Sequence, residues 1–388
     1  MKPRPPSQNS ADTLRVLHVI TTLDVGGAEV ALKKLVLGDP LRGDRHVVVS
    51  LKDIGPIGRD LEAAGVTVHA LHMQRRYVGG FLSLIRLIKR LKPSVVQTWL
   101  YHGDLIGGLA ARAAGRRAVI WGLHNARFVR GQTRLTVLVM RLCAILSPWL
   151  PRVIVCCAEA ARVAHVGWGY QATRMRVIPN GFELPDLREI GALRDAARAE
   201  LGIQPELIVV GIVARFDPTK DHESFLKAAA IIARRNSLVR FMLVGRGVDE
   251  RNDFLMRLVR EGELEGRCML LGERREVQRF YAAMDVFCLC SVYEAFPLVL
   301  GEAMAMALPC VVTDAGDARR IVGGTGRIIP PGRPNELAEA LGEAIEMSPD
   351  DRRAVGLAAR RRIEMEFSMA QTRRLFEQAY LDACVSSD

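Results

Sequence analysis

The fold is decided by the stretch Ser291-Val-Tyr-Glu294-Ala-Phe-Pro-Leu-Val-Leu-Gly-Glu302-Ala-Met304. Residues 285–290, which precede it, form a short apolar run with turn-prone flanks, and this pattern predicts a buried strand. Residues 298–307 have the apolar spacing of a helix, and Pro297 suits a first helical position. This order places Glu294 in the loop that leaves the carboxyl end of a strand.

Two glutamates flank the predicted helix start. Glu302 is expected about one turn into the helix, and the free backbone N–H groups of the first turn lie between it and Glu294. A helix N-terminus binds anions, phosphate above all, and a glutamate on each side accepts hydrogen bonds from hydroxyl groups. The stretch therefore suits a ligand composed of a sugar, a diphosphate and a ribose. The alternative is a surface loop with two solvated glutamates.

Length and composition limit the classes of protein to which the chain can belong. A chain of 388 residues is too long for one ordinary core, and 25% charged with 49% hydrophobic residues is typical of a soluble globular protein. No apolar run is long enough to span a membrane. Residues 1–13 are expected to form a disordered tail, not a signal peptide. The eight cysteines lack zinc spacing and are expected to be buried free thiols.

The charge is unevenly distributed along the chain. Residues 1–190 hold 27 Lys and Arg against 13 Asp and Glu, whereas residues 191–388 hold 27 against 30. Within residues 70–141 there are thirteen basic residues and one acid, Asp104. A one-sided basic surface attracts polyanions, either nucleic acid or an anionic membrane. The alternative is a solvated face in an arginine-rich protein.

Strand-like and helix-like patterns alternate through both halves, which predicts an α/β protein with two doubly wound Rossmann-like domains that face each other across a cleft. We expect a first domain over 14–185, a linker with some helix over 186–204 and a second domain over 205–368. A last helix, 369–388, is expected to cross back to the first domain. The helix predicted over 81–92 is apolar on one face and basic on the other, which suits packing on the sheet or a membrane interface.

Two places in the first half carry candidate ligand groups. Gly26 and Gly27 follow the first predicted strand and precede a helix, the order of a phosphate cradle, although the dinucleotide fingerprint G-x-G-x-x-G is absent. The alternative for this pair is a tight turn that needs positive φ. His124 ends a predicted parallel strand, where open α/β sheets place their chemistry.

Two cations flank one strand-to-helix turn in the second half. Arg215 and Lys220 follow the strand predicted over 207–215, and together they suit a diphosphate, the arginine bidentately and the lysine as a point charge. The alternative is that these cations lie on the surface and pair with Asp217 or Asp221.

Several motifs together resemble retaining glycosyltransferases of the GT-B fold, in family four of the glycosyl transferases group 1. The resemblance covers about residues 14–384. It rests on Gly-Gly-Ala-Glu29, His124-Asn125, Val177-Ile-Pro-Asn-Gly181, Val213-Ala-Arg-Phe-Asp-Pro-Thr-Lys-Asp-His222, Leu243-Val-Gly-Arg-Gly247 and the Glu294–Glu302 stretch. The chain departs from the family at Ala158, where serine is common, and at Ala307-Leu308, where Gly-Val is usual.

The resemblance implies a role for each candidate residue. Arg215 and Lys220 would hold the donor diphosphate, Glu302 the ribose hydroxyls and Glu294 the transferred sugar. Glu294 and His124 would be the catalytic pair, with His124 contacting the sugar from the acceptor side. The remaining donor contacts would come from Gly26 and Gly27 and from the backbone of Phe296, Pro297, Leu298 and Val299.

The resemblance also implies a retaining, hexosyltransferase-like enzyme that needs neither a metal nor a cofactor, since the nucleotide sugar is its substrate. The acceptor would be a membrane lipid-linked group or a saccharide in polysaccharide or glycolipid biosynthesis. We expect a cytoplasmic, peripheral protein at the inner face of an anionic membrane, without nucleic acid as a partner. A covalent double displacement is an alternative to attack on the same face.

Other functional classes were weighed against this one. A nucleotide-sugar epimerase shares the architecture, and so does a phosphorylase, although no motif suggests its pyridoxal-phosphate lysine. A non-catalytic module that binds membranes or nucleic acid would explain the basic half. Aromatic residues make up only 6% of the chain, which gives few platforms for stacking bases. Arg215, Lys220, Glu294 and Glu302 together favour the enzyme.

Overall fold

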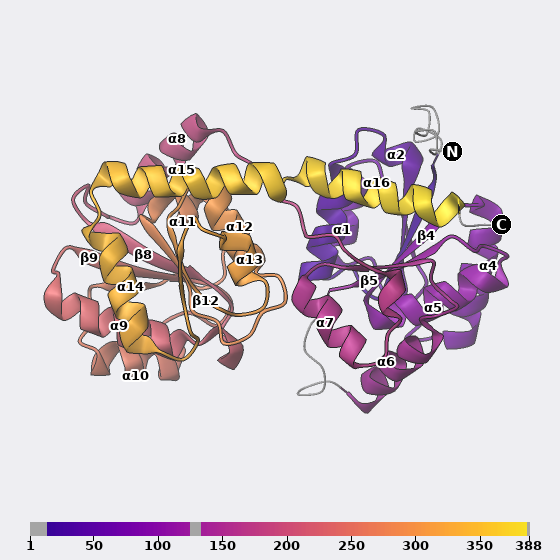
Figure 1. Ribbon diagram of the computed structural model, residues 1–388, viewed down its shortest axis with the longest axis horizontal. Coiled ribbons are helices and arrows are strands. Elements are labelled where there is room, and N and C mark those ends of the chain that lie inside the picture. The colour runs from indigo at the N-terminus through magenta and orange to yellow at the C-terminus, as the bar shows by residue number, and fades with distance from the viewer. Residues whose placement is uncertain (1–13, 125–132, 386–388) are drawn as a thin grey trace. The chain divides into compact units, whose positions relative to one another are not determined.

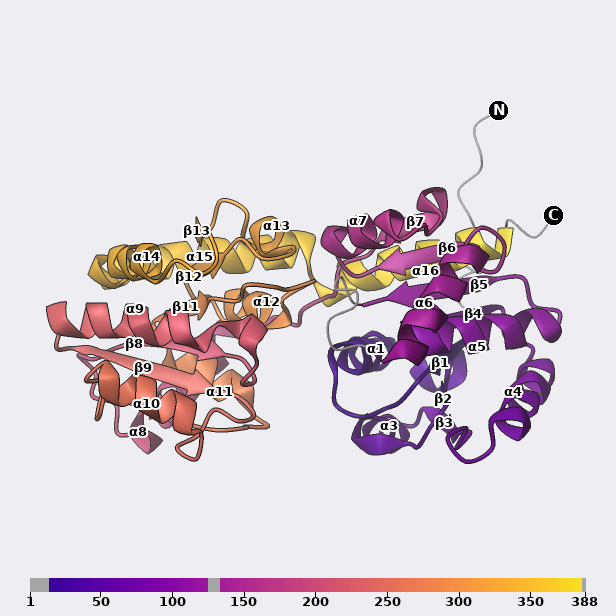
Figure 2. The ribbon, with the colours of Figure 1, turned by 90° about the horizontal axis from the view of Figure 1, so that it is seen from below.

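The computed structural model describes residues 14–124 and 133–385; the predicted N-terminal tail, 1–13, lies outside these ranges. The chain divides into two compact units (Figures 1 and 2). Unit 1 comprises Met1–Gly181 and Met369–Asp388, and unit 2 comprises Phe182–Ser368. The α/β class and the two Rossmann-like sheets predicted from the sequence are confirmed.

The sheet of unit 1 has seven parallel strands among the described residues, in the order β3-β2-β1-β4-β5-β6-β7. Strands β1 and β4 are paired at the centre with Val16 opposite Val95. Every residue of both strands is buried, as expected for a sheet that is covered on both faces. The strands are β1 (Val16–Ile20), β2 (His46–Ser50), β3 (Thr67–Ala70), β4 (Val95–Trp99), β5 (Val119–Leu123), β6 (Val153–Cys156) and β7 (Met175–Val177).

Helices cover both faces of this sheet. On one face α1, α3 and α16 bury their apolar residues in a single core, so the end of the chain, Met369–Val385, is part of unit 1. On the other face α5 packs against β4 and β5 and also contacts α4 and α6. The helices are α1 (Gly27–Leu37), α2 (Arg42–Arg45), α3 (Gly55–Ala63), α4 (Tyr77–Leu91), α5 (Leu100–Ala113), α6 (Arg134–Leu146), α7 (Glu159–Gly167) and α16 (Met369–Val385).

The sheet of unit 2 has six parallel strands, in the order β10-β9-β8-β11-β12-β13. The chain builds outward from β8 to β10 and then returns to add β11 on the other side of β8. This reversal is the switch point of a doubly wound sheet. The strands are β8 (Ile208–Val213), β9 (Val239–Val244), β10 (Cys268–Leu270), β11 (Val286–Leu289), β12 (Cys310–Thr313) and β13 (Arg327–Ile329).

The alternation of side chains along β11 shows how the helices of unit 2 divide between two faces. Val286 and Cys288 join the core under α9, α10 and α14, whereas Phe287 points the other way and meets Tyr281 of α11 edge-on. Helix α8 packs on α11, and α15 packs on α12. The helices are α8 (Leu187–Glu200), α9 (His222–Arg235), α10 (Asp253–Glu261), α11 (Val277–Ala283), α12 (Leu298–Ala305), α13 (Ala318–Val322), α14 (Pro334–Glu346) and α15 (Pro349–Glu366).

Some details differ from the sequence-based expectations. The segment 186–204, expected to be a linker with some helix, is mostly helix α8. Arg194 on this helix forms a 2.6 Å ion pair with Asp285, so the segment is an integral part of unit 2. Pro297 is the residue before α12, not its first residue. All eight cysteines are free, and six of them are buried. Within the described ranges, no helix has both the length and the apolar character needed to cross a bilayer.

Candidate functional site

The predicted site residues of unit 2 gather at its switch point. Strand β8 lies between β9 and β11, so the loops that follow β8 and β11 leave the same edge of the sheet side by side. Lys220 comes from the first loop and Glu294 from the second. In open α/β sheets, ligands bind in the crevice outside the carboxyl ends of the strands at this point.

Lys220 and Glu294 are in direct contact. The Nζ atom of Lys220 lies 2.6 Å from Oε1 of Glu294, and their side chains are only 17% and 10% exposed. The hydroxyl of Ser291 donates a second hydrogen bond, of 2.7 Å, to the same oxygen. The backbone N–H of Val292 donates to the carbonyl of Thr219 at 2.9 Å and ties the two loops together. A cation and an anion are therefore fixed next to each other before any ligand binds.

The β8 loop is shaped by two aspartates. Asp217 begins the short 3-10 helix Pro218–Lys220 by accepting hydrogen bonds from the backbone and the hydroxyl of Thr219. These bonds, and then that of Arg215, lower the pKa of Asp217 to about 2. Asp221 has φ of 50° and caps α9 by accepting from the N–H of Ser224. Lys220 thus sits between two capped helical turns, which restrict where its ammonium reaches.

Arg215 is placed differently from Lys220. Its side chain is 57% exposed, and its Nη2 lies 3.1 Å from Oδ2 of Asp217. Pairing with Asp217 was the structural alternative for this residue, and it is the arrangement observed. In Arg215 the loop therefore offers an exposed guanidinium whose present partner is an adjacent carboxylate on the same turn.

The β11 loop leads into α12 and brings Glu302 beside a buried tyrosine. The hydroxyl of Tyr281 donates to Oε2 of Glu302 at 3.3 Å. The ring of Phe296 is buried and stacks on Phe182 with 6.0 Å between ring centres, so only the backbone of Phe296 is available to a ligand. Pro297 is also buried, while Leu298 and Val299 in the first turn of α12 are half-buried.

A glycine allows the closest approach to the β11 loop. Gly316 has φ of 57°, and a Cβ atom built on it would lie 2.4 Å from the carbonyl oxygen of Glu294. The N–H of Asp317 donates to the carbonyl of Ala295 at 3.0 Å. The segment after β12 therefore supports the backbone that carries Glu294, a role that the sequence pattern did not reveal.

In unit 1, Gly26 and Gly27 form the start of α1. Gly26 has an extended backbone with φ of −155°, and neither glycine has positive φ, so the expected alternative of a strained tight turn is wrong. A Cβ atom on Gly26 would lie 2.4 Å from Oε2 of Glu29, whereas one on Gly27 would meet nothing within 4 Å. Glu29 is buried in the first turn, and burial raises its pKa. A side chain at Gly26 would thus have to displace the Glu29 carboxylate, whereas Gly27 leaves the helix start open.

His124 lies directly after β5, at the carboxyl end of the strand. Its ring stacks on Trp99 of the neighbouring β4, with ring centres 5.0 Å apart. Its Nε2 is buried and has no hydrogen-bond partner among the described residues. Burial lowers the pKa of His124 to about 4, so the imidazole is neutral at pH 7. Asn125, the next residue of the motif, lies outside the described ranges.

The predicted residues thus divide between the two units. Gly26, Gly27 and His124 belong to unit 1, and the remainder belong to unit 2. Sequence reasoning missed Ser291 and Tyr281, which hold the two glutamates. Ser291 stands in the decisive stretch, three positions before Glu294, where its hydroxyl was a visible candidate; nothing in the sequence pointed to Tyr281.

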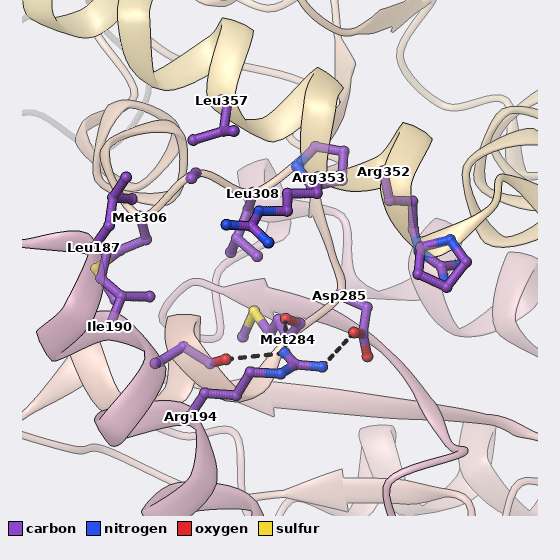
Figure 3. A pocket seen from close by; sticks show the side chains of 15 residues that line it. Leu187, Ile190, Arg194, Met284, Asp285, Met306, Leu308, Arg352, Arg353 and Leu357 are labelled. Atoms are coloured by element: carbon purple, nitrogen blue, oxygen red, sulfur yellow. Dashed lines mark hydrogen bonds and ion pairs between the residues drawn. The ribbon is translucent and has the colours of Figure 1, made fainter.

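A separate cavity of about 490 Å³ opens at the other end of the unit 2 sheet (Figure 3). Asp285 and Pro309, which precede β11 and β12, line it. Arg194 points into it but is bound on three sides, by the carbonyls of Ala282 at 3.1 Å and Met284 at 2.8 Å and by Asp285. Because the polar groups drawn in contact satisfy one another, we interpret the cavity as a packing junction between α8 and α15.

Across residues 14–124 and 133–385, no group of three or more His, Cys, Asp or Glu side chains has the geometry to hold a metal ion.

Two protein-family models together match most of the chain. Residues 25–185 match the model described as Glycosyltransferase Family 4, and residues 207–347 match the model described as Glycosyl transferases group 1. The protein EpsF of Bacillus subtilis is 27% identical over 310 residues, which is 78% of this chain and 79% of that protein. The UDP-Gal:alpha-D-GlcNAc-diphosphoundecaprenol alpha-1,3-galactosyltransferase of Escherichia coli is 28% identical over 60% of this chain and 61% of that protein.

Among solved structures, Anabaena HepE in complex with UDP superposes with a TM-score of 0.81 at 21% identity, over 94% of this chain and 99% of that one. The same protein in complex with UDP-glucose gives a TM-score of 0.79 at 21% identity, over 94% and 98%. Both halves of the sequence, the order of both sheets and these relatives lead to one conclusion: the chain is a glycosyltransferase of the GT-B fold and belongs to family four, group 1.

Proposed function

We propose that the chain is a retaining glycosyltransferase that moves a hexose from a nucleotide-sugar donor to a lipid-linked or saccharide acceptor, in the biosynthesis of a cell-surface polysaccharide or glycolipid. The observation that carries the proposal is the Lys220–Glu294 ion pair at the switch point of unit 2. It sets a cation for a phosphate beside an anion for sugar hydroxyls. A nucleotide sugar carries these two kinds of group on adjacent parts of the molecule.

Lys220 and Arg215 would bind the donor diphosphate, and Glu302 would bind the ribose. When the bond between the anomeric carbon and the phosphate oxygen breaks, negative charge develops on the leaving diphosphate. Fixed positive groups stabilise that charge most when they are already in place, and loss of one such group typically lowers the rate by about 10²–10³. The first turn of α12 offers its backbone N–H groups to the same phosphate.

Retention would follow from attack on the face that the leaving group vacates. The acceptor hydroxyl would form the new bond to the anomeric carbon, and its proton would pass to the departing phosphate oxygen. Glu294 would orient the sugar and shield positive charge at the anomeric carbon. In this scheme the cationic side chains take the part that a metal ion plays elsewhere, so transfer would be independent of metal. His124, neutral at pH 7, and the Gly26-Gly27 turn would contribute from unit 1.

Two relatives support the choice of substrates. HepE was crystallised with UDP and with UDP-glucose, which favours a uridine donor here. The named substrate of the Escherichia coli relative is a diphosphoundecaprenol, which favours a lipid-linked acceptor. A membrane-bound acceptor, together with 27 basic against 13 acidic residues in residues 1–190, leads us to place the protein in the cytoplasm as a peripheral protein at the inner face of an anionic membrane.

The test is a panel of nucleotide sugars incubated with the purified chain, with UDP-glucose and UDP-galactose first. We expect slow release of UDP from one of them, and a rise of melting temperature with that donor but not with an oligonucleotide. Conversion of the donor into an epimer without release of nucleotide would support an epimerase instead. Stabilisation by the oligonucleotide alone would support a non-catalytic binding module.

A further inference from the structure

Helix α6 has two apolar faces, and only one of them is packed. Val139, Met140, Cys143 and Ala144 are buried, and the helix contacts α5 (Figure 1). A second set of large apolar side chains, the outer stripe, is exposed to solvent. Its members are Leu135 (61% exposed), Leu138 (53%), Leu142 (38%) and Ile145 (62%) on α6, and Trp149 (65%), which lies three residues beyond the end of the helix.

The spacing of the outer stripe is that of a single helix face. Its four members on α6 follow one another at intervals of three, four and three residues. At 100° per residue these positions span about 80° of the helix surface. Soluble proteins seldom leave a contiguous row of this kind in water, and such rows mark interaction surfaces. The outer stripe therefore requires a partner that α5 does not supply.

The charges around the stripe are all of one sign. Residues 105–158 contain eight arginines and no Asp or Glu. Arg134 and Arg141 are exposed on α6 and fall beside Ile145 on the helical projection. Within the described residues, neither makes an ion pair. Helix α6 and the segments next to it in the sequence thus carry positive charge and contribute no carboxylate.

A second group of arginines surrounds the end of the stripe. Arg112 donates to the backbone carbonyl of Trp149, and Arg174 donates to the carbonyl of Pro151 at 2.7 Å. Burial lowers the pKa of Arg112, and the charges of Arg152, Arg117 and Arg174 lower it further, which shows how closely these cations are gathered. Trp149 is therefore an exposed indole set among guanidinium groups.

We propose that the outer stripe of α6 inserts into the interface of an anionic bilayer, with Trp149 at the level of the headgroups and the arginines on lipid phosphates. Exposed apolar side chains on one helix face, flanked by cations, are the pattern of helices that lie in a membrane interface. Tryptophan prefers the depth where an apolar ring meets water and headgroups. The surface serves the lipid-linked acceptor of the proposed function, but its binding to lipid does not depend on sugar transfer.

A second copy of this chain is a poorer occupant. A symmetric contact through α6 would bring two surfaces of arginines together without a carboxylate between them, and like charges oppose such a contact. Helix α4 is also a poorer membrane element, although Arg86, Lys89 and Arg90 are exposed on it. It buries Leu84, Leu87 and Ile88 in unit 1. Its large exposed apolar side chains, Tyr77, Val78 and Leu82, lie in its first two turns and spread over about 140° of the helix surface, so they do not form one stripe.

The proposal is tested with the full chain and vesicles of phosphatidylcholine, with or without 30% phosphatidylglycerol. The double variant Leu138→Gln/Ile145→Gln should bind the anionic vesicles at least about tenfold more weakly than the wild type, because two inserted apolar side chains are lost. The matched control is Val163→Gln/Leu238→Gln, which removes two apolar side chains of 58% and 46% exposure outside the stripe and should bind like the wild type. Equal binding of all three proteins would overturn the proposal.

The charges and the tryptophan give independent measurements. Arg134→Gln and Arg141→Gln should each weaken binding roughly fivefold, since each basic residue near the surface contributes about 1 kcal/mol. Trp149 fluorescence, taken as the difference between the wild type and Trp149→Phe, should shift to the blue with anionic vesicles. Concentration-dependent dimers that the double variant abolishes, without vesicle binding by the wild type, would assign the stripe to a second copy and overturn the proposal.

UDP release from the donor separates this inference from the proposed function. If the wild type binds vesicles through α6 but hydrolyses no nucleotide sugar, the surface stands and the enzyme assignment fails. If the donor is hydrolysed equally by all variants and none differs in vesicle binding, the enzyme assignment stands and the surface fails.

Discussion

The ammonium of Lys220 lies 2.6 Å from the carboxylate of Glu294, although 74 residues separate them in the chain. The contact exists because β11 is added next to β8, where the sheet changes direction. It fixes the positions of two opposite charges in the proposed donor site, with the cation on the β8 loop and the anion on the β11 loop. Each partner also keeps the other from being a lone, poorly solvated charge.

Loss of the cation should reduce both turnover and stability, and only stability should be recoverable. Lys220→Met leaves Glu294 with little compensation beyond the Ser291 hydroxyl, so the melting temperature should fall. Adding Glu294→Gln removes the unpaired charge and should restore part of that loss. Turnover should stay at least about tenfold below the wild type in both variants, since the diphosphate has lost its lysine. Recovery of turnover in the double variant would assign Lys220 a purely structural role.

The single variant Glu294→Gln separates binding from chemistry. It frees Lys220 from its carboxylate, so the affinity for UDP should be unchanged or higher. Turnover should fall by at least about tenfold, because the charge that faces the anomeric carbon is gone. Isothermal titration with UDP and the assay of released nucleotide measure the two effects. Weakened UDP binding with unchanged turnover is the opposite result and would remove Glu294 from the chemistry.

Arg215 offers a test on an exposed side chain. Arg215→Ala should lower turnover by at least about tenfold while the fold survives, because the guanidinium is 57% exposed and pairs with Asp217 on its own turn. Arg234→Ala, which removes an exposed arginine at the other end of α9, is the matched control and should turn over normally. In the same assay, EDTA should leave wild-type transfer intact. Loss of activity on chelation, with recovery in magnesium or manganese, would refute a site that relies on side-chain cations.

Much of this arrangement follows from the sequence. The alternation of apolar runs predicted nearly every strand and the long helices, because buried parallel strands and amphipathic helices have distinct periods. Strand β13 was missed because it has only three residues, Arg327–Ile329, between turns. Helix α8 was taken for a linker because its sequence is charged and rich in alanine. Its burial depends on Arg198 and Arg194, which bind Asp285 some ninety residues away.

The members of the proposed site could be chosen from sequence motifs, but their contacts with one another could not. Lys220 and Glu294 could be assigned to diphosphate and sugar from their motifs, but their direct pairing depends on which strand lies beside β8. The sequence does not state the order of strands. The outer stripe of α6 was hidden for a related reason, since the sequence of an apolar helix does not show how much of its surface another element covers.

Acidification should destabilise unit 1 through His165. The side chain is fully buried, with Nδ1 2.6 Å from the carbonyl of Ala161 and Nε2 3.1 Å from the hydroxyl of Tyr101, and burial lowers its pKa to about 4. Between pH 4 and 6.5 the unfolded chain binds the proton and the folded chain does not. Stability is therefore complete above pH 6.5 and falls toward pH 4, by up to about 1.4 kcal/mol per pH unit for one such group.

The measurement compares unfolding by urea at pH 5 and pH 7. His165→Gln should be less stable than the wild type at pH 7 but should lose less stability on acidification. The slope of its unfolding free energy against pH should be smaller by the contribution of about one proton. Leu35→Ala, a buried substitution in the same unit without a titratable group, is the control for destabilisation alone and should keep the wild-type slope. Identical slopes for the wild type and His165→Gln would show that the histidine does not carry the effect.

A single substitution at Ala307 should raise the stability of unit 2. Ala307 has φ of 59°, a conformation that a residue with a Cβ atom adopts at a cost of about 1–2 kcal/mol. The turn cannot relax easily, because Gly356 of α15 packs so closely that a Cβ atom on it would lie 1.9 Å from the carbonyl oxygen of Ala307. Ala307→Gly removes the strain and adds some entropy to the unfolded chain, so we expect a net gain of about 0.5–1 kcal/mol. For a unit of this size that is a rise in melting temperature of roughly 1–4 °C.

Ala196→Gly, at an exposed position inside α8, is the matched control and should lower stability by about 1 kcal/mol. A loss of stability in both variants would show that the αL backbone at Ala307 is not strained.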